Sequence, residues 1–242
     1  TYTVSLADGL TGNVFAALPV EYGEDAVLPE VTPWHEGYHF TGWSADGRNI
    51  TADCTITANY EQNSYTVRFV DYDGTELSSQ SVFWGEAAAA PEAPEREGYT
   101  FTGWDADFSN IRKDLTVTAQ YRFVLSFADV SETDWFCEDV RWAVENGIFQ
   151  GVGNGLFAPE QALTRGQLVT VLYRMVGSPE PKAEANFRDV AADSYYAKAV
   201  AWANENGIVL GMGDGQDLMP KATASRAQAA AILHRFAAVV EK

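Results

Sequence analysis

Two internal duplications divide the 242-residue chain into halves of different character. In the N-terminal half, "EGYHFTGWSADGRNITADCTITANY" at 36–60 returns as "EGYTFTGWDADFSNIRKDLTVTAQY" at 97–121. In the C-terminal half, "FADVSETDWFCEDVRWAVENGI" at 127–148 returns as "FRDVAADSYYAKAVAWANENGI" at 187–208. Repeats of this length are supersecondary units that recur along a chain, so four structural units are expected. The predicted boundaries are 1–62, 63–123, 124–178 and 179–242.

Both copies in the N-terminal half have the alternation of β-strands. The run "YTVRFV" at 65–70 alternates and is rich in β-branched and aromatic residues, and an Asp-Gly pair follows it as a hairpin signal. In "TITANY" at 55–60, the period of two places Ile56, Ala58 and Tyr60 on one side of a sheet and the polar residues on the other. Each copy is therefore predicted to form a half-buried sheet.

One tryptophan ends a "GYxFxGW" frame in each of these copies, Trp43 in the first and Trp104 in the second. Because the frame is dense with apolar residues, we expect each ring to anchor the core of its repeat. Stacking against a sugar ring is the alternative role for the same side chains.

The C-terminal half has helical periodicity instead. Val140, Ala143 and Val144 recur at helical spacing before Gly147, which stands where a C-terminal cap belongs. In each copy a glycine-rich turn then leads into a second amphipathic helix, and the proline-containing stretch 176–186 is the expected linker between the copies. The predicted apolar faces of the second helices are Leu168, Val171, Leu172 and Met175 in one copy and Ala229, Ile232, Leu233 and Phe236 in the other.

Charge and composition exclude several classes of partner. The net charge of −18 disfavours nucleic acid and anionic membrane surfaces. No run of about 18 apolar residues occurs, so membrane insertion is not expected, and the alternating start of the chain does not resemble a signal peptide. Cys54 and Cys137 fall in different predicted domains, which favours buried or free thiols over a disulfide.

Motifs for catalysis or for a bound cofactor are not found in the sequence. It has no nucleophile elbow, phosphate-binding loop, HExxH or paired-cysteine pattern, and three histidines and two cysteines are few for a zinc site. The stretch "DYDGTE" at 71–76 is too short for a calcium loop and is expected to be a hairpin turn. We therefore predict a non-enzymatic protein with no cofactor and no metal.

A short motif centred on arginine occurs in both copies of the second duplication, as "TRGQ" at 164–167 and "SRAQ" at 225–228. The Thr or Ser and the Gln three residues later have the spacing of a capping box, so helix geometry accounts for them. It does not account for Arg165 and Arg226, because a cation in the first turn opposes the helix dipole at a cost of about 0.3–1 kcal/mol. A guanidinium beside the free amides of a helix start favours a carboxylate or phosphate ligand.

The alternative role for the two arginines is structural, with each paired to an acidic residue such as Asp129 or Asp189 across the module. The glycines before the motif are expected to supply left-handed turns, and they would also let a sugar approach the backbone. The aromatic pairs Trp135-Phe136 and Tyr195-Tyr196 are expected in the core, with stacking on a sugar as the alternative. The glycines concerned are Gly151, Gly153, Gly155, Gly211, Gly213 and Gly215.

The N-terminal half, over residues 2–122, resembles the Listeria–Bacteroides repeat on the basis of "GYxFxGW" and the closing "TxTAxY". This family is a β-grasp-like module found in tandem in bacterial surface proteins, including the repeat region of internalins. The resemblance implies a stalk or interaction module without catalysis.

The C-terminal half, from residue 127 to about 240, resembles the S-layer homology module. The motifs are Phe-x-Asp-Val, Trp-Ala, Asn-Gly-Ile, Gly-x-Gly-x-Gly, a following Pro and then Thr/Ser-Arg-x-Gln, each in order twice. Such modules attach bacterial surface proteins non-covalently to secondary cell-wall polymers, often through pyruvylated sugars. They usually occur as three modules in a pseudo-threefold bundle, whereas this sequence has two.

These resemblances imply a multidomain α+β protein, with two β-grasp-like repeats followed by an all-α pair of helical modules. The expected location is extracellular, at the wall of a Gram-positive bacterium, and the expected partner is an anionic wall polysaccharide. The competing hypothesis is self-assembly, in which the incomplete bundle and the β-sheet edges contact other subunits. The predicted glycan-binding residues are Arg165, Arg226, Gly151, Gly153, Gly211, Gly213, Asn154, Asp214, Trp135, Tyr195, Gln167 and Gln228.

Overall fold

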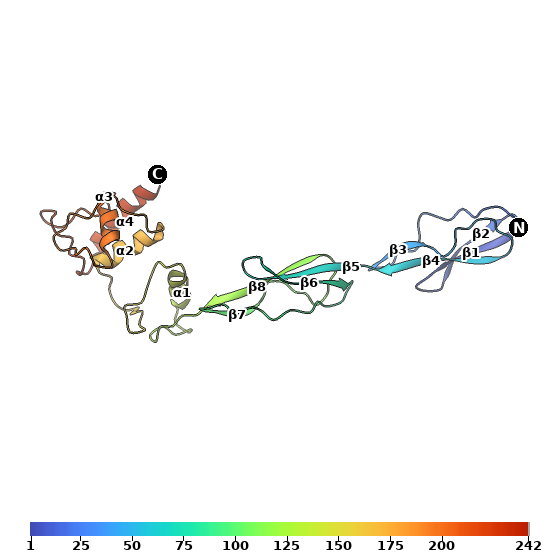
Figure 1. Cartoon of the computed structure of the whole chain (residues 1–242), viewed down its shortest axis with the longest axis horizontal. Helices are drawn as coiled ribbons and strands as arrows, with labels where there is room; N and C mark the ends of the chain where they lie inside the picture. Colours follow the sequence, from blue (N-terminus) through green and yellow to red (C-terminus); the bar gives the residue numbers. More distant parts are fainter. Residues whose placement is uncertain (242) are drawn as a thin grey trace. The chain divides into compact units, whose positions relative to one another are not determined.

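The computed structural model describes residues 1–241 and divides into two compact units at the bond between Arg122 and Phe123. The first unit contains two β-rich regions and the second is helical (Figure 1). This coarse order of β-rich repeats followed by a helical part confirms the sequence prediction. The finer labels, β-grasp-like for the repeats and all-α for the modules, and the division into four domains stay predictions.

Each N-terminal repeat is a four-stranded sheet with the same topology. The strand order is β2-β1-β4-β3 in the first and β6-β5-β8-β7 in the second. Strands β1 and β4 pair in parallel, as do β5 and β8, and β1–β2 and β5–β6 are antiparallel hairpins. The strands are β1 (Tyr2–Asp8), β2 (Val14–Val20), β3 (Tyr38–Trp43), β4 (Cys54–Gln62), β5 (Ser64–Val70), β6 (Glu76–Phe83), β7 (Tyr99–Trp104) and β8 (Leu115–Phe123).

The alternation read from the sequence is present in the sheets. Ile56 and Ala58 are buried, whereas Thr55 and Asn59 on the opposite face of β4 are exposed. Trp43 packs against the core of the first repeat, and Trp104 packs against that of the second, as predicted. Residues 71–75 form the predicted hairpin turn between β5 and β6, closed by the N–H of Asp71 donating to the carbonyl of Thr75.

A short junction connects the two sheets within the first unit. The N–H of Trp84 donates to the carbonyl of Asn63 at 2.8 Å, and the N–H of Asn63 donates to the carbonyl of Gly37 at 2.8 Å. Gly37 has a φ of +79°, and a Cβ on it would lie 2.2 Å from the Trp84 ring. The junction therefore depends on a residue without a side chain at position 37.

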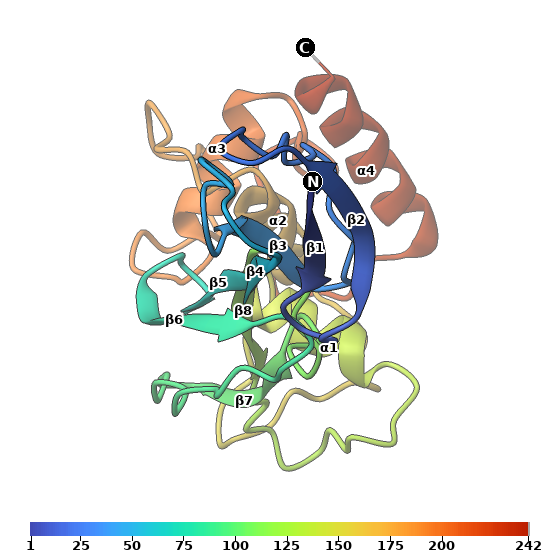
Figure 2. The ribbon, with the colours of Figure 1, turned by 90° about the vertical axis from the view of Figure 1, so that its right-hand side faces the viewer.

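Within residues 123–241 the second unit contains four helices, of which α2, α3 and α4 lie together while α1 lies apart from them (Figure 1). The longest of them, α4, is drawn end to end in Figure 2. Gly147, with a φ of +69°, follows the C-cap of α1 as predicted. Packing of α2 onto α3 carries residues from both modules into one apolar core. The helices are α1 (Cys137–Glu145), α2 (Arg165–Met175), α3 (Ala197–Glu205) and α4 (Arg226–Val240).

The predicted apolar faces of α2 and α4 need correction. Leu172 is buried, but Met175 at the end of the predicted face is exposed. Burial on α2 extends instead to a second face that contains Gly166, Val169 and Tyr173, because this face packs against the other module. On α4, Leu233 was expected inside and is 47% exposed.

No helix within residues 1–241 is long and apolar enough to cross a membrane. Cys54 is half-buried and Cys137 is buried, and both are free thiols, as the sequence analysis favoured.

Alanine at position 37 is expected to destabilise the first unit more than alanine at position 85. Gly85 has a similar φ of +80° but open space around its Cβ position, so Gly85→Ala bears only the backbone cost of about 1–2 kcal/mol. Gly37→Ala adds displacement of the Trp84 ring. Urea unfolding, followed by circular dichroism and tryptophan fluorescence, measures the free energy of unfolding of both variants. Equal decreases for Gly37→Ala and Gly85→Ala would show that the contact between Gly37 and the Trp84 ring does not require a glycine.

Candidate functional site

An aspartate fixes the turn before the second helix in each module. The carboxylate of Asp129 accepts the N–H groups of Phe157 at 2.8 Å and Ala158 at 2.7 Å. Asp189 does the same for Leu218 at 2.9 Å and Met219 at 2.7 Å. These bonds show that residues 157 and 158 are equivalent to 218 and 219, a shift of 61.

The same bonds stabilise a backbone conformation that side chains disfavour. Ala158 and Met219 have φ values of +59° and +57°, in the left-handed region. The N–H of Phe157 is the main cause of a lowered pKa for Asp129, which burial opposes and the N–H of Ala158 reinforces. The charged form of Asp129 is therefore the form that holds the turn.

Both predicted capping boxes are present. The side chain of Thr164 accepts the N–H of Gln167, and the Gln167 side chain accepts the N–H of Thr164. Ser225 and Gln228 make the same pair of bonds at the start of α4. Gln167 and Gln228 are thus held in place by the helix starts.

Arg165 is buried between the two modules. Its side chain is 5% exposed, and its Nε donates to the carbonyl of Leu218 at 2.7 Å. Backbone bonds run alongside, from the N–H of Arg165 to the carbonyl of Ala222 and from the N–H of Gly166 to that of Pro220. Burial lowers the pKa of Arg165, and Asp189 partly opposes this by favouring the charged form.

Arg226 occupies the same place in the second motif and has a different environment. Its side chain is exposed, and among residues 1–241 it makes no hydrogen bond or ion pair. The structure therefore separates two residues that the sequence analysis treated alike. For Arg165 it provides the structural partner that was the alternative hypothesis, including Asp189 as the nearby acid.

A groove of about 510 Å³ lies beside this junction. Its wall on α2 includes Gln167, Thr170 and Arg174, and Tyr195 reaches it from the second module. The guanidinium of Arg174 donates to the side chain of Gln150 at 2.9 Å and to the carbonyl of Ile148 at 3.4 Å. The groove thus combines one cation, several hydrogen-bonding side chains and an aromatic ring. Its remaining lining residues are Phe149, Gly151, Val152, Phe157, Ala158, Pro159, Gln161, Leu163 and Val171.

The structure brings three of the predicted residues into this groove, namely Gly151, Gln167 and Tyr195. Gly153 and Asn154 lie in the exposed turn next to it, and Gly211, Gly213, Asp214 and Gln228 lie at the equivalent positions of the second module. Trp135 is also exposed. A glycan-binding role for the twelve residues stays a prediction.

Arg174 was missed by the sequence analysis. The signal was present, since "LYRM" at 172–175 and "LHRF" at 233–236 place Arg174 and Arg235 at equivalent positions. In the structure each guanidinium faces the same carbonyl of its own module, that of Ile148 or Ile208. The first-turn arginines drew attention because they oppose the helix dipole, whereas an arginine in the last turn agrees with it.

The two aromatic pairs divide between surface and core. Trp135 and Tyr195 are exposed, while Tyr196 is buried and Phe136 is half-buried. The expectation that the pairs close the core is thus wrong for the first member of each. Adjacent residues on the turn before α1 and α3 point in different directions, so one ring enters the core as the other leaves it.

The glycines of the two turns have positive φ as predicted, with one exception. Gly151 is not in the left-handed region, and a Cβ there would lie 2.6 Å from the carbonyl oxygen of Leu156 and from the Phe127 ring. Gly151 is therefore required for space and not for its backbone angle. The glycines with positive φ are Gly153, Gly155, Gly211, Gly213 and Gly215.

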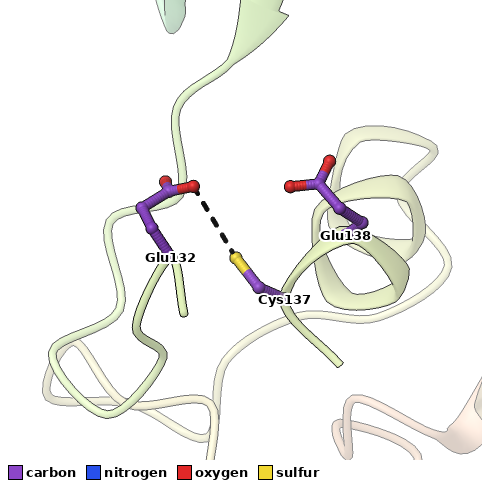
Figure 3. Close-up of side chains that lie close together, drawn as sticks. All are labelled: Glu132, Cys137 and Glu138. Carbon is purple, nitrogen blue, oxygen red and sulfur yellow. Dashed lines mark hydrogen bonds between the residues drawn. The ribbon is translucent and has the colours of Figure 1, made fainter. Parts of the chain in front are cut away.

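A cluster of ligand-type side chains in the first module contains Glu132, Cys137 and Glu138 (Figure 3). The guanidinium of Arg141 lies among them, with Nη2 2.7 Å from both oxygens of Glu132 and Nε 3.5 Å from Glu138. Although burial of Arg141 opposes its charge, the carboxylates raise its pKa above the ordinary value. Arg141 also donates to the carbonyl of Phe123. The positive charge that a metal would bring is already supplied by this arginine.

Family models match both halves of the chain. That of the Listeria-Bacteroides repeat domain matches residues 2–63 and 65–122, and that of the S-layer homology domain matches residues 126–169 and 186–230. The resemblances drawn from the motifs are thereby confirmed.

Several curated proteins are similar over part of the chain. Internalin H of Listeria monocytogenes is 38% identical over 97 residues, which is 35% of this chain and 17% of that protein. The surface-layer 125 kDa protein of Lysinibacillus sphaericus is 34% identical over 96 residues, 40% of this chain and 8% of that protein. The S-layer protein sap of Bacillus anthracis is 29% identical over 91 residues, which is 37% of this chain and 11% of that protein. The chain spans less than a quarter of the length of each.

Among solved structures, the type 2 repeat of the mucus binding protein MUB from Lactobacillus reuteri aligns with 49% of this chain and 97% of its own. The sequence identity is 15% and the TM-score is 0.17.

Replacing each motif arginine by alanine tests the difference between them. Arg165→Ala leaves the carbonyl of Leu218 without its donor in a buried junction and is expected to lower the free energy of unfolding by about 1–3 kcal/mol. Arg226→Ala changes an exposed side chain and is expected to stay within about 0.5 kcal/mol of the parent in dilute solution. Thermal and urea unfolding measure both, and equal effects would contradict the assignment of Arg165 to the junction.

Asp129→Asn tests the charged turn through its pH dependence. The folded-state pKa of Asp129 is depressed, so its contribution is present above the ordinary value of 3.8 and is lost as pH falls through the lower folded value. The variant should be less stable at neutral pH, and the difference should narrow at pH values below about 3.8. Urea midpoints across pH, with the exposed Asp193→Asn as control, would contradict this account if the difference were constant.

Proposed function

Because the chain carries two Listeria-Bacteroides repeat domains followed by two S-layer homology domains, we propose that it holds a protein at the bacterial surface by binding the cell wall. The binding element is the groove beside the module junction, and the ligand is an anionic secondary wall polymer with carboxylate groups such as pyruvyl ketals. The role is one of attachment and is non-enzymatic. The observation that carries the proposal is the position of Arg174 and Tyr195 on opposite modules of one groove.

The groove has the chemical groups that a carboxylated sugar requires. Arg174 offers a cation with several N–H donors, which suits a planar carboxylate. The hydroxyl of Tyr195 and the side chains of Gln161 and Gln167 offer hydrogen bonds to sugar hydroxyls, and the exposed Tyr195 ring offers a face for stacking. In a chain with a net charge of −18, such a local cation is needed to hold an anionic polymer.

The position of Tyr195 couples binding to the junction. The Tyr195 ring is largely exposed, but partial burial is still the main cause of its raised pKa, whereas a hydrogen bond with Thr164 and the charge of Arg174 lower it. Both of these groups belong to the first module, and Arg174 lines the same groove as Tyr195. The bound sugar would therefore contact both modules at once.

The two β-repeats are proposed to act as a spacer or as an interaction surface outside the wall. Their sheets have half-exposed aromatic residues such as Phe101 and Tyr72, and the described residues of the repeats contain no helix. The finer β-grasp-like assignment belongs to this proposal. The predicted glycan-binding residues of the second module outside this groove are proposed to serve an equivalent site there, namely Arg226, Gly211, Gly213, Asp214 and Gln228.

Loss of Arg174 is the direct test. Arg174→Ala is expected to weaken binding to purified Gram-positive wall sacculi about tenfold or more, because a hydrogen bond to a charged group is worth about 1.5–3 kcal/mol. Tyr195→Ala should weaken it less, and Arg68→Ala is the control because Arg68 is exposed on β5 and pairs with Glu76, outside both helical modules. Co-sedimentation with sacculi measures all three.

The same sacculi stripped of their secondary polymer provide the second arm of the experiment. The parent protein should remain in solution with the stripped sacculi. Equal sedimentation with both preparations, or a folded Arg174→Ala variant that binds as the parent does, would refute the proposed site.

A further inference from the structure

The two S-layer homology modules differ at one packed position beside their first helices, α1 and α3. The repeat that aligns Phe127 with Phe187 also aligns Arg141 on α1 with Ala201 on α3. Around this position the second module has three alanines where the first has larger polar or ionisable residues. The residues of the first module are Glu132, Cys137 and Arg141, and their equivalents are Ala192, Ala197 and Ala201.

In the first module the side chain of Arg141 fills this position. It is 5% exposed, and its Nη2 lies 2.7 Å from both carboxylate oxygens of Glu132 and 3.6 Å from Sγ of Cys137. Its Nη1 donates to the carbonyl of Phe123, in the segment that precedes the module. Figure 3 shows Glu132, Cys137 and Glu138 grouped around this place. The guanidinium therefore connects the preceding segment, the turn at Glu132 and the helix.

In the second module the same place is a pocket of about 340 Å³. The three replacement alanines all line it. Ala183, which corresponds to Phe123, lines it as well. The segment, turn and helix that Arg141 connects in the first module thus surround an open space in the second. Its apolar walls also include Pro181, Ala185 and Val190.

The acidic groups of this pocket lie on the segment before Phe187. Glu184 stands where the first module has Val124, and Glu180 stands where it has Gln120. The ammonium of Lys198 donates to both carboxylate oxygens of Glu180, at 2.8 and 2.9 Å, so these two charges are paired. Within residues 1–241 the carboxylate of Glu184 makes no hydrogen bond or ion pair. The pocket therefore combines apolar walls with one unpaired carboxylate.

We propose that this pocket binds an arginine side chain of a partner polypeptide, in the position that Arg141 occupies in the first module. The aliphatic part of the side chain would pack on Ala197 and Ala201, and its guanidinium would pair with Glu184. The pocket shares no lining residue with the groove assigned to the wall polymer. This binding is therefore a second function, independent of the first.

The charge and the walls of the pocket favour arginine over other ligands. An anion would be repelled by Glu184, and a purely apolar group would cover this carboxylate without giving it a partner. A guanidinium is planar, has several N–H donors and is less strongly hydrated than an ammonium, so it suits a partly enclosed site better than lysine does. The stem of an arginine packs well on apolar surface. The net charge of −18 also attracts a basic segment at long range.

Capped tripeptides with a central arginine, lysine or leucine between two glycines are the probes for this site. Each is titrated into the ¹⁵N-labelled chain and followed by amide NMR shifts. The arginine peptide should shift the amides of Ala197 and Ala201 with a dissociation constant in the millimolar range, and the other two should bind at least several-fold more weakly. Absence of binding, or equal binding of the three peptides, would overturn the proposal.

Two variants locate the binding in the pocket. Glu184→Gln removes only the exposed carboxylate and should weaken binding of the arginine peptide about tenfold, because a hydrogen bond to a charged group is lost. The double variant Ala192→Glu with Ala201→Arg restores the pair of the first module, so its own arginine should fill the pocket and abolish binding. Glu145→Gln is the matched control, since Glu145 is exposed on α1 of the other module.

The control variant should bind the arginine peptide as the parent does. Binding unaltered by Glu184→Gln, or retained by a folded double variant, would overturn the assignment to this pocket. Because Glu184 is exposed, the first variant is expected to fold and decides the question even if the double variant does not. Neither result depends on wall binding, which involves a different set of residues.

Discussion

The second unit depends on the burial of a second face of α2 against the other module. A helix in one module would ordinarily bury only the stripe that faces its own core. Here Val169, Leu172 and Tyr173 enter the core of the second module, and Arg165 enters with them. The buried guanidinium is tolerated because it donates to the carbonyl of Leu218 and lies near Asp189. Apolar packing thus joins the two modules, and the hydrogen bond from Arg165 to the carbonyl of Leu218 fixes their relative position at this contact.

This junction positions the groove. With one face held by α3, α2 directs Gln167 and Arg174 to an open side, and the start of α3 brings Tyr195 to the same place. A site assembled from two modules is as rigid as the packing between them. In the proposed binding site, Arg165 would connect stability with binding, because it holds the junction beside the groove without lining the groove itself.

Much of the local structure follows from sequence patterns with a direct physical cause. The period of two predicted the buried residues of β4, and the spacing of Thr164 and Gln167 predicted a capping box that the structure contains. Gly147 and the Asp73-Gly74 turn were predictable because few residues other than glycine adopt the positive φ of Gly147 and Gly74. Each of these features depends on residues only a few positions apart, so a short stretch of sequence is enough to predict it.

The contacts between modules could not be predicted in the same way. The buried face of α2 includes Arg165, Gly166 and Thr170, which no hydrophobic pattern would select. Trp135 and Tyr195 are large aromatic residues and yet are exposed, because the neighbouring Phe136 and Tyr196 occupy the inward side of the same turns. Arg174 has an equivalent in Arg235 that the sequence shows. A cation near the C-terminal end of a helix is already explained by the helix dipole, however, so nothing in the sequence pointed to a binding role for Arg174.

The central claim is that a carboxylated wall sugar binds across the two modules in the groove of α2. Titration of the ¹⁵N-labelled chain with a purified pyruvylated wall oligosaccharide, followed by amide and side-chain NMR shifts, tests it most directly. The account predicts that Gln167, Arg174 and Tyr195 shift together with one saturating dependence on sugar concentration. Shifts confined to one module or to the β-repeats, or no shifts at saturating sugar, would contradict it.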